Sequence, residues 1–216
     1  VMARSSVSYV CQQCGSESPK WAGKCDDCGA WNTLVEERKN TPNGPGKRAF
    51  GRQIAVEPLL SAHAAAPSPR MQSNILEFDR VAGGGLVPGS ATLIGGDPGI
   101  GKSTLLLQLT CNLSKRGFRT AYISGEESTD QVRMRANRLG LANAAVELGT
   151  STNASDIASS INGPNRPDLV VIDSIQTMFL PGLDSAPGTV SQVRASAQEL
   201  IRAAKNNCVA LLIVGH

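Results

Sequence analysis

The sequence predicts an α/β fold with a parallel sheet, preceded by a small cysteine-rich module. Two observations predict the sheet: short apolar runs lack alternation, as strands buried on both faces do, and helical apolar periods separate these runs. Two pairs of closely spaced cysteines predict the module. The 216 residues suffice for one domain with a satellite, and 41% apolar with 18% charged residues exclude a fully disordered, collagen-like or coiled-coil chain.

Four cysteines define the first module, which we expect over residues 1–35. Cys11 and Cys14 belong to one CxxCG segment, and Cys25 and Cys28 belong to a second. Each CxxC can put two thiolates on one tight turn, so two facing turns offer four sulfurs to a tetrahedral Zn²⁺. Two disulfides and a redox dithiol are the alternatives. We favour structural zinc because an intracellular chain keeps disulfides reduced and neither pair lies in a βαβ pattern.

Both tryptophans, Trp21 and Trp31, lie in or beside this module. Because so short a module has almost no core, we expect their rings to pack over the metal site. Base stacking or contact with a partner is the alternative. Two further cysteines, Cys111 and Cys208, lie in apolar surroundings and are expected to be core thiols.

A basic connector is expected over residues 36–70. It contains a cluster of turn-forming residues at 41–46 and an Ala/Pro/Ser stretch at 62–70. The first 70 residues hold nine Lys/Arg against six Asp/Glu and so carry the whole net charge of +3, and no acid occurs between Arg38 and Val56. A solvated linker and an arm that contacts a polyanion both fit this basic run.

The α/β domain is expected over residues 71–216. Apolar runs predict strands at residues 91–94, 120–123, 169–172 and 209–214. Helical periods lie between them, at residues 102–116, 132–139 and 190–204. Ligands of parallel sheets bind at the carboxyl ends of the strands, so the loops after these runs form the candidate site.

The loop after the first of these strands carries the strongest chemical signal. It is a complete GxxxxGK[ST] motif between a strand and a helix. Backbone N–H groups of such a loop surround phosphate oxygens, while Lys102 can reach the β- and γ-phosphates and the Ser103 hydroxyl can coordinate Mg²⁺. The motif predicts that a nucleoside triphosphate binds to Gly96, Asp97, Pro98, Gly99, Ile100, Gly101, Lys102, Ser103 and Thr104.

Ionisable residues follow three further strands. Asp173 is expected to hold Mg²⁺, and a simple turn residue is the alternative. Glu126 and Glu127 offer a carboxylate that can polarise the water attacking the γ-phosphate, unless they only favour a helix N-terminus. His216 either hydrogen-bonds the γ-phosphate and senses its hydrolysis or has no such role.

Taken together, these segments resemble the bacterial RadA family of DNA repair proteins, also called Sms, within the RecA-like ATPases. The resemblance rests on the four-cysteine module and on five segments, which read RVAGGGLVPGS, GGDPGIGKST, SGEES, LVVIDSIQT and LLIVGH. It implies a RecA-like P-loop NTPase core with an N-terminal zinc ribbon or knuckle. The implied cofactors are ATP, Mg²⁺ and Zn²⁺.

The resemblance also implies a function and roles for single residues. Family members are hexameric, DNA-dependent ATPases of homologous recombination, and they drive branch migration as helicases on single-stranded DNA, with a RecA-type recombinase as partner. Lys102 and Ser103 would bind nucleotide and Mg²⁺, and Asp173 would be the second acidic motif. Glu126 would activate water, with Glu127 as its alternative, and the residue at position 216 would be the sensor.

A second class of function fits the same core. It is a nucleotide-switched ATPase of the circadian-clock type, which signals to protein partners without helicase activity. The zinc module and the basic connector favour the DNA motor. The loop of residues 178–189 and the basic residues Arg194, Arg202 and Lys205 are candidate DNA contacts, with a solvated helix face as the alternative.

Length and hydropathy give two further expectations. Family members continue past the last strand of this chain into a Lon-protease-like domain, so we expect the ATPase domain to be truncated on its C-terminal side. No apolar run approaches the roughly 18 residues that span a bilayer, and the N-terminus has no apolar signal-peptide core. We therefore expect a cytoplasmic, nucleoid-associated protein without a membrane partner.

Overall fold

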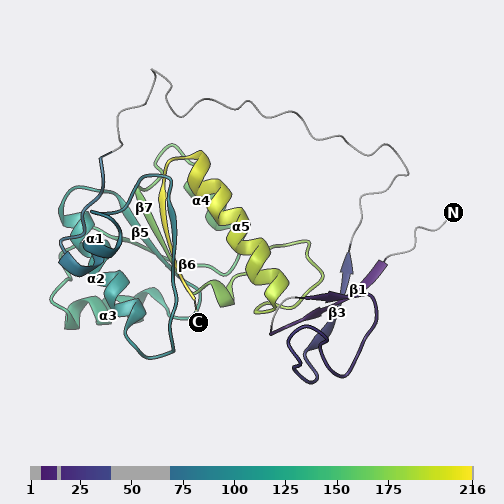
Figure 1. The fold of residues 1–216 in the computed structure, drawn as a ribbon. Coiled ribbons are helices and arrows are strands. Elements are labelled where there is room, and N and C mark those ends of the chain that lie inside the picture. Colours follow the sequence, from purple (N-terminus) through teal and green to yellow (C-terminus); the bar gives the residue numbers. More distant parts are fainter. Residues whose placement is uncertain (1–5, 14–15, 40–68, 216) are drawn as a thin grey trace, which may run out of the picture.

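The computed structural model contains an N-terminal ribbon and an α/β domain (Figure 1). It describes residues 6–13, 16–39 and 69–215. Two of the residues singled out above, Cys14 and His216, lie outside the described residues, as does most of the expected connector.

Five parallel strands form the sheet of the α/β domain, in the spatial order β4-β8-β7-β5-β6. Their bounds are β4 Ala91–Ile94, β5 Thr120–Ser124, β6 Glu147–Thr150, β7 Leu169–Asp173 and β8 Ala210–Val214. The register puts Ser124 beside Asp173 and Ile94 beside Val214. The predicted parallel sheet is confirmed, and its strand ends meet at one edge.

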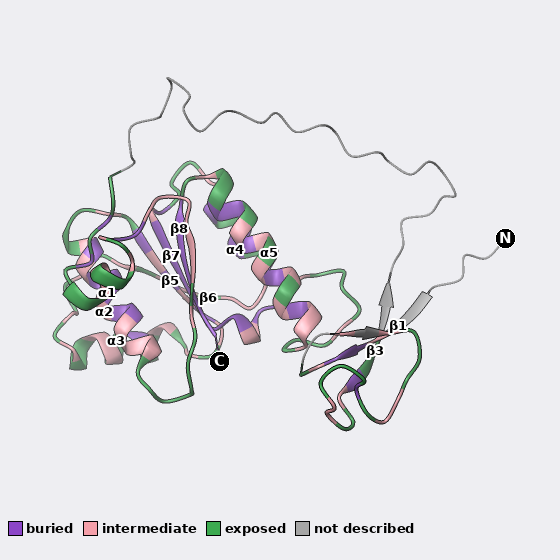
Figure 2. Ribbon diagram, viewed as in Figure 1, coloured by how far each residue is buried: buried purple, intermediate pink, exposed green. Residues whose placement is uncertain are grey.

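Helices cover both faces of this sheet. One layer contains α2 (Lys102–Lys115) and α3 (Thr129–Arg138), and the other contains α4 (Ala154–Ile161) and α5 (Val190–Asn206). A short helix α1 (Leu76–Val81) precedes the sheet, and a 3₁₀ turn η1 (Ile175–Thr177) follows β7. Figure 2 shows the central strands buried between the two layers. Their continuous apolar runs follow from this burial on both faces.

The sequence did not predict β6, α4 or the short elements α1 and η1. Strand β6 reads Glu-Leu-Gly-Thr and lies at the edge of the sheet, so it needs little apolar character. Helix α4 is short and rich in Ala and Ser, and its buried side is formed by Ala154, Ile157, Ala158 and Ile161. β6 has no apolar run to indicate a strand. The buried positions of α4 follow helical spacing, but the helix is only 8 residues long and half of its apolar positions are Ala, which gives little sequence signal.

The ribbon is a small antiparallel sheet of β1 (Ser6–Cys11), β2 (Glu17–Ser18) and β3 (Leu34–Lys39), in the order β2-β1-β3. Its buried apolar cluster is small and consists of Cys11, Cys25 and Leu34 with partly buried neighbours. The expectation for the tryptophans is wrong, because Trp21 is 59% and Trp31 is 70% exposed. Lys24 instead places its ammonium 5.9 Å from the centre of the Trp31 ring.

The ribbon contacts the α/β domain at the start of α5. The backbone N–H of Val190 donates to Oε1 of Gln12 over 3.2 Å, and strand β1 packs near the same helix. Of the two cysteines expected in the core, Cys111 is buried, but Cys208 is exposed, so that expectation is wrong for Cys208. Within the described residues, no helix has the length and apolar character that crossing a bilayer requires.

Candidate functional site

The phosphate-binding loop joins β4 to α2, as its motif requires. Gly101 occupies the N-cap of α2 at a φ of 99°, a left-handed conformation that glycine adopts without steric cost. No side chain caps this helix, so its first backbone N–H groups face the loop and can bind an anion. Nζ of Lys102 donates to the carbonyl oxygens of Gly96 at 2.5 Å and Asp97 at 2.7 Å, which ties the loop to the helix.

A cavity of about 320 Å³ lies between this loop and the ends of β5, β7 and β8. Its lining consists of Pro98, Gly99, Gly101, Lys102, Ser103, Thr104, Glu126, Arg135, Asp173, Ser174 and Val214. Three residues of the motif, Gly96, Asp97 and Ile100, belong to the same loop but do not line the cavity. The structure thus brings the loop together with Glu126 and Asp173.

Asp173 ends β7 and is held by a buried tyrosine of the neighbouring strand. The hydroxyl of Tyr122 donates a hydrogen bond to Oδ2 of Asp173. Burial, followed by the charge of Asp173, raises the pKa of Tyr122 above its usual value, so the phenol stays protonated and remains a donor. This contact fixes the carboxylate at the wall of the cavity. The Ser103 hydroxyl and the Asp173 carboxylate are oxygen ligands of the kind that Mg²⁺ prefers.

The two glutamates that follow β5 have different partners. Oε1 of Glu126 accepts a hydrogen bond from Oγ of Ser174 at 3.0 Å, and Glu126 lines the cavity. Glu127 instead forms an ion pair with Arg135 of α3 and lines neighbouring hollows. Oγ of Ser124 accepts from the backbone N–H groups of both glutamates, at 3.3 and 2.8 Å, and so fixes the turn that presents them.

Gly125 precedes these glutamates at a point where two segments approach closely. A Cβ at this position would lie 1.9 Å from Oγ1 of Thr177, which belongs to the turn after β7. The close approach brings the β5 turn against the segment that carries Ser174. A glycine is therefore required to bring Glu126 within reach of its hydrogen-bond partner.

The cysteine site of the ribbon fits a metal ion. The sulfurs of Cys11, Cys25 and Cys28 lie within 4.8 Å of one another, and the Sγ atoms of Cys11 and Cys28 are 3.6 Å apart. Hydrogen bonding with the Ser16 hydroxyl, followed by that with the backbone of Cys28, lowers the pKa of the Cys25 thiol. A lowered pKa favours the thiolate, which is the form that binds metal. The fourth predicted ligand, Cys14, lies outside the described residues.

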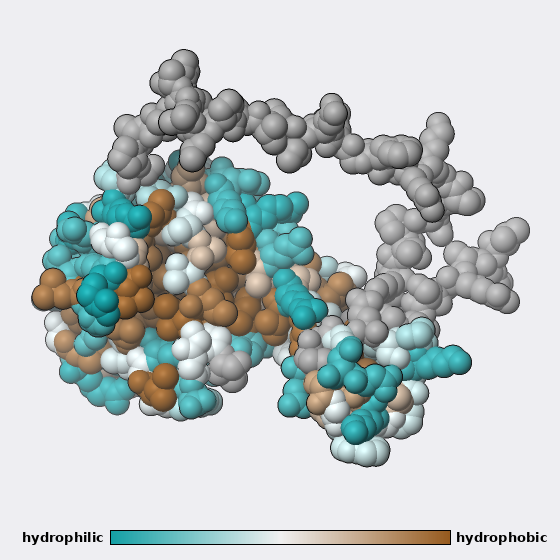
Figure 3. All heavy atoms as spheres, viewed as in Figure 1, coloured by the Kyte–Doolittle hydropathy of each residue, from teal (hydrophilic) through white to brown (hydrophobic). Residues whose placement is uncertain are grey.

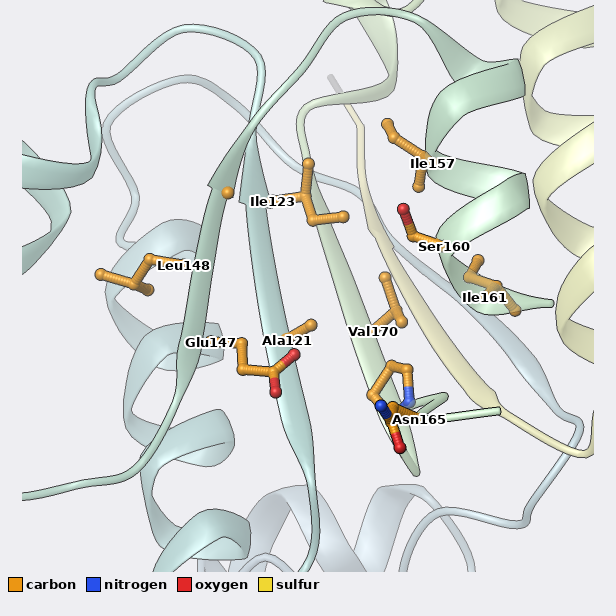
Figure 4. Close-up of a pocket in the computed structure, with 11 residues that line it drawn as sticks. Ala121, Ile123, Glu147, Leu148, Ile157, Ser160, Ile161, Asn165 and Val170 are labelled. Atoms are coloured by element: carbon orange, nitrogen blue, oxygen red, sulfur yellow. The ribbon is translucent and has the colours of Figure 1, made fainter. Parts of the chain in front are cut away.

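A second hollow lies between α4 and the strands β5, β6 and β7. Figure 4 shows Ile157, Ser160 and Ile161 of α4 beside Ala121, Ile123 and Val170 of the sheet. In the space-filling view, apolar side chains gather on another part of the α/β domain, beside helix α5 (Figure 3). The hollow shares no lining residue with the cavity at the phosphate-binding loop, so it is a separate feature.

Three residues around the cavity were missed from the sequence: Tyr122, Arg135 and Ser174. Tyr122 lies inside a buried strand, where its side chain reads as part of the core. Arg135 lies eight positions after Glu127 on a helix with two other arginines. Only the folded arrangement distinguishes it from Arg133 and Arg138, which are exposed.

Comparison with known families defines the class of protein. Residues 72–216 match the family model described as an AAA domain, and residues 9–36 match the one described as a rubredoxin metal binding domain. The chain therefore belongs to the AAA domain family and carries a metal-binding ribbon. The DnaB-like replicative helicase solved with primase has the same fold, with a TM-score of 0.56 and 16% identity over 70% of this chain and 45% of that chain.

Relatives with established names identify the family more specifically. The chain is 54% identical to the DNA repair protein RadA of Brucella abortus, 48% to that of Pseudomonas aeruginosa and 46% to that of Bacillus subtilis. Each match covers the whole chain and 47–48% of the relative, so the chain spans about half the length of these proteins. The resemblance to the RadA family is confirmed.

Proposed function

We propose that this chain is the ATPase part of a DNA-dependent motor of homologous recombination and DNA repair. The observation that carries the proposal is the cavity in which Lys102, Ser103, Glu126 and Asp173 converge at the strand ends. A phosphate-binding loop, two oxygen ligands for Mg²⁺ and a carboxylate near the γ-phosphate position are the parts that ATP hydrolysis requires.

Several polar residues of the cavity have proposed roles in hydrolysis. Lys102 neutralises the β- and γ-phosphates, and Ser103 and Asp173 hold Mg²⁺, which supplies charge stabilisation when it is bound. Glu126 accepts a proton from the attacking water, and its hydrogen bond from Ser174 orients the carboxylate. Glu127 is the less suitable base because its carboxylate is paired with Arg135. His216 is proposed as the sensor that follows β8.

The proposal also includes an action on DNA. The names of the relatives support DNA repair, and the fold is shared with a DnaB-like replicative helicase. We propose a homo-hexamer that moves on single-stranded DNA, promotes branch migration with a RecA-type recombinase, and works in the cytoplasm at the nucleoid. We also propose the division into a zinc module, a basic linker and an ATPase domain, with the linker as one source of salt-dependent DNA affinity.

The DNA motor is tested by the ATPase rate of the protein at its full natural length, with and without single-stranded DNA. A motor hydrolyses ATP several-fold faster on DNA because its cycle is coupled to movement. A rate that single-stranded DNA leaves unchanged would refute the motor and favour the clock-type switch. Measuring at two salt concentrations adds a second check, since phosphate contacts weaken steeply with salt.

The catalytic assignment is tested by Glu126→Gln, with Glu127→Gln as its matched control. We expect Glu126→Gln to keep ATP binding and to lower kcat by roughly 10² to 10⁴, because a general base contributes about that much. Glu127→Gln should retain most of its turnover. If the two variants exchange these outcomes, the base is Glu127.

A further inference from the structure

Arg135 is a charged side chain of the cavity that the proposed roles leave unused. It lies on α3, its side chain is 16% exposed, and it lines the cavity with Lys102 and Glu126. One of its terminal nitrogens, Nη2, is paired with Glu127. The other, Nη1, is buried and has no hydrogen-bond partner within the described residues.

A buried guanidinium nitrogen of this kind requires an acceptor. The group stays protonated, offers only donors and accepts no hydrogen bond, so it cannot relieve its burial by losing its charge. A buried charged donor without an acceptor costs more free energy than a neutral donor without one. An anion bound in the cavity that Arg135 lines would supply this acceptor.

The nearby carboxylates already have partners. Glu126 accepts from Ser174, Asp173 accepts from Tyr122, and Glu127 is held by the other nitrogen of Arg135. The phosphate-binding loop and the N-terminus of α2 lie at one side of the cavity, and Glu126 and Asp173 lie at the strand ends. Arg135 reaches the cavity from the helix that follows the Glu126 turn. This is the side on which the γ-phosphate of a bound nucleoside triphosphate must face its attacking water.

We propose that Arg135 hydrogen-bonds the γ-phosphate through Nη1 and so distinguishes ATP from ADP within a single subunit. This inference rests on the proposed function and extends it to a residue that the sequence motifs do not contain. The guanidinium adds positive charge where negative charge must be stabilised during hydrolysis. Arg135 also holds Glu127, which lies just before α3. When the γ-phosphate is lost, Arg135 therefore keeps its contact with Glu127 and loses its contact with the nucleotide.

The test compares nucleotide affinities of Arg135→Gln and Arg138→Gln with those of the unaltered protein. Arg138 lies on the same helix, is exposed and does not line the cavity, so it is a matched control. Dissociation constants are measured with Mg²⁺ for ADP and for an ATP analogue that resists hydrolysis. We expect Arg135→Gln to raise the dissociation constant of the analogue by about tenfold or more, because a charge-assisted hydrogen bond is lost. The dissociation constant of ADP should change by less than about twofold.

Other outcomes overturn the inference. Equal weakening of both nucleotides in Arg135→Gln would mean that Arg135 only maintains the shape of the cavity. Unchanged affinities would mean that it does not touch the nucleotide. An equal effect of Arg138→Gln would show that net charge alone is responsible. Circular dichroism and the melting temperature establish that each variant is folded.

Glu127→Gln gives a second measurement that does not alter Arg135 itself. This variant removes the charge that holds Nη2 and leaves Nη1 in place, so we expect the preference for the ATP analogue over ADP to persist. A lost preference would assign the discrimination to Glu127 instead. Failure of the proposed function has a different signature: the unaltered protein would bind neither nucleotide, and Lys102→Ala would then change nothing.

Discussion

The ribbon and the α/β domain differ in what holds them together. The α/β domain has two apolar layers, one on each face of a fully paired sheet centre. The ribbon has a buried cluster of two cysteines and one leucine, and both tryptophans are exposed. A segment of this size buries too little apolar surface to fold alone. The comparison indicates that metal coordination supplies the stability of the ribbon, while apolar burial supplies that of the α/β domain.

Removal of the metal should have the largest effect. Structural zinc contributes about 10 to 16 kcal/mol in zinc-finger peptides, so a strong chelator or Cys25→Ser should unfold the ribbon and leave the α/β domain folded. The measurement is the dispersion of backbone amide signals of residues 9–36, together with the zinc content. Tryptophan fluorescence is a weak reporter here, because Trp21 and Trp31 are already exposed.

Cys208→Ser is the matched control for this prediction, since Cys208 is exposed on the α/β domain. It should leave the zinc content and the ribbon signals unchanged. Ribbon signals that survive complete removal of zinc would contradict the dependence on metal. Loss of the α/β signals on chelation would contradict the separate origins of stability.

A substitution that leaves a cavity in one of the apolar layers should have the next largest effect. Leu106 is fully buried on α2, and Leu106→Ala should lower the free energy of unfolding of the α/β domain by about 2 to 5 kcal/mol. The exposed Leu76 is the control, and Leu76→Ala should change it by less than about 0.5 kcal/mol. Denaturant unfolding followed by circular dichroism measures both. Loss of zinc from Leu106→Ala under native conditions would mean that the two units do not fold independently.

The same comparison explains how far the sequence was predictive. The central strands and the phosphate-binding loop were predicted, because burial on both faces and phosphate binding leave signals within a few consecutive residues. Strand β6 was missed because its sequence, Glu-Leu-Gly-Thr, contains no apolar run. The tryptophans were misjudged because their burial would require a core that the ribbon does not have.

The residues of the site likewise divide into those that the sequence predicted and those that only the fold revealed. Lys102, Ser103 and Asp173 were assigned from local pattern, and the fold places all three around one cavity. Arg135 and Ser174 could not be assigned, because their roles depend on pairs 8 and 48 positions apart, Arg135 with Glu127 and Ser174 with Glu126. Such pairs form only when the turn after β5 meets α3 and the end of β7. Tertiary contacts therefore carry the information that motifs lack.

The junction between the two units should give the smallest effect. Thr189 caps α5 by accepting from the N–H of Gln192, and Gln12 of the ribbon accepts from the N–H of Val190. The ribbon thus supplies one of the acceptors that a helix N-terminus needs. Gln12→Ala should speed amide exchange at Val190 by up to about tenfold, since a neutral hydrogen bond contributes about 0.5 to 1.5 kcal/mol, and should leave both units folded. The neighbouring exposed Gln13 is the control, and exchange at Val190 that responds equally to Gln13→Ala would show that α5 does not depend on Gln12 for its cap.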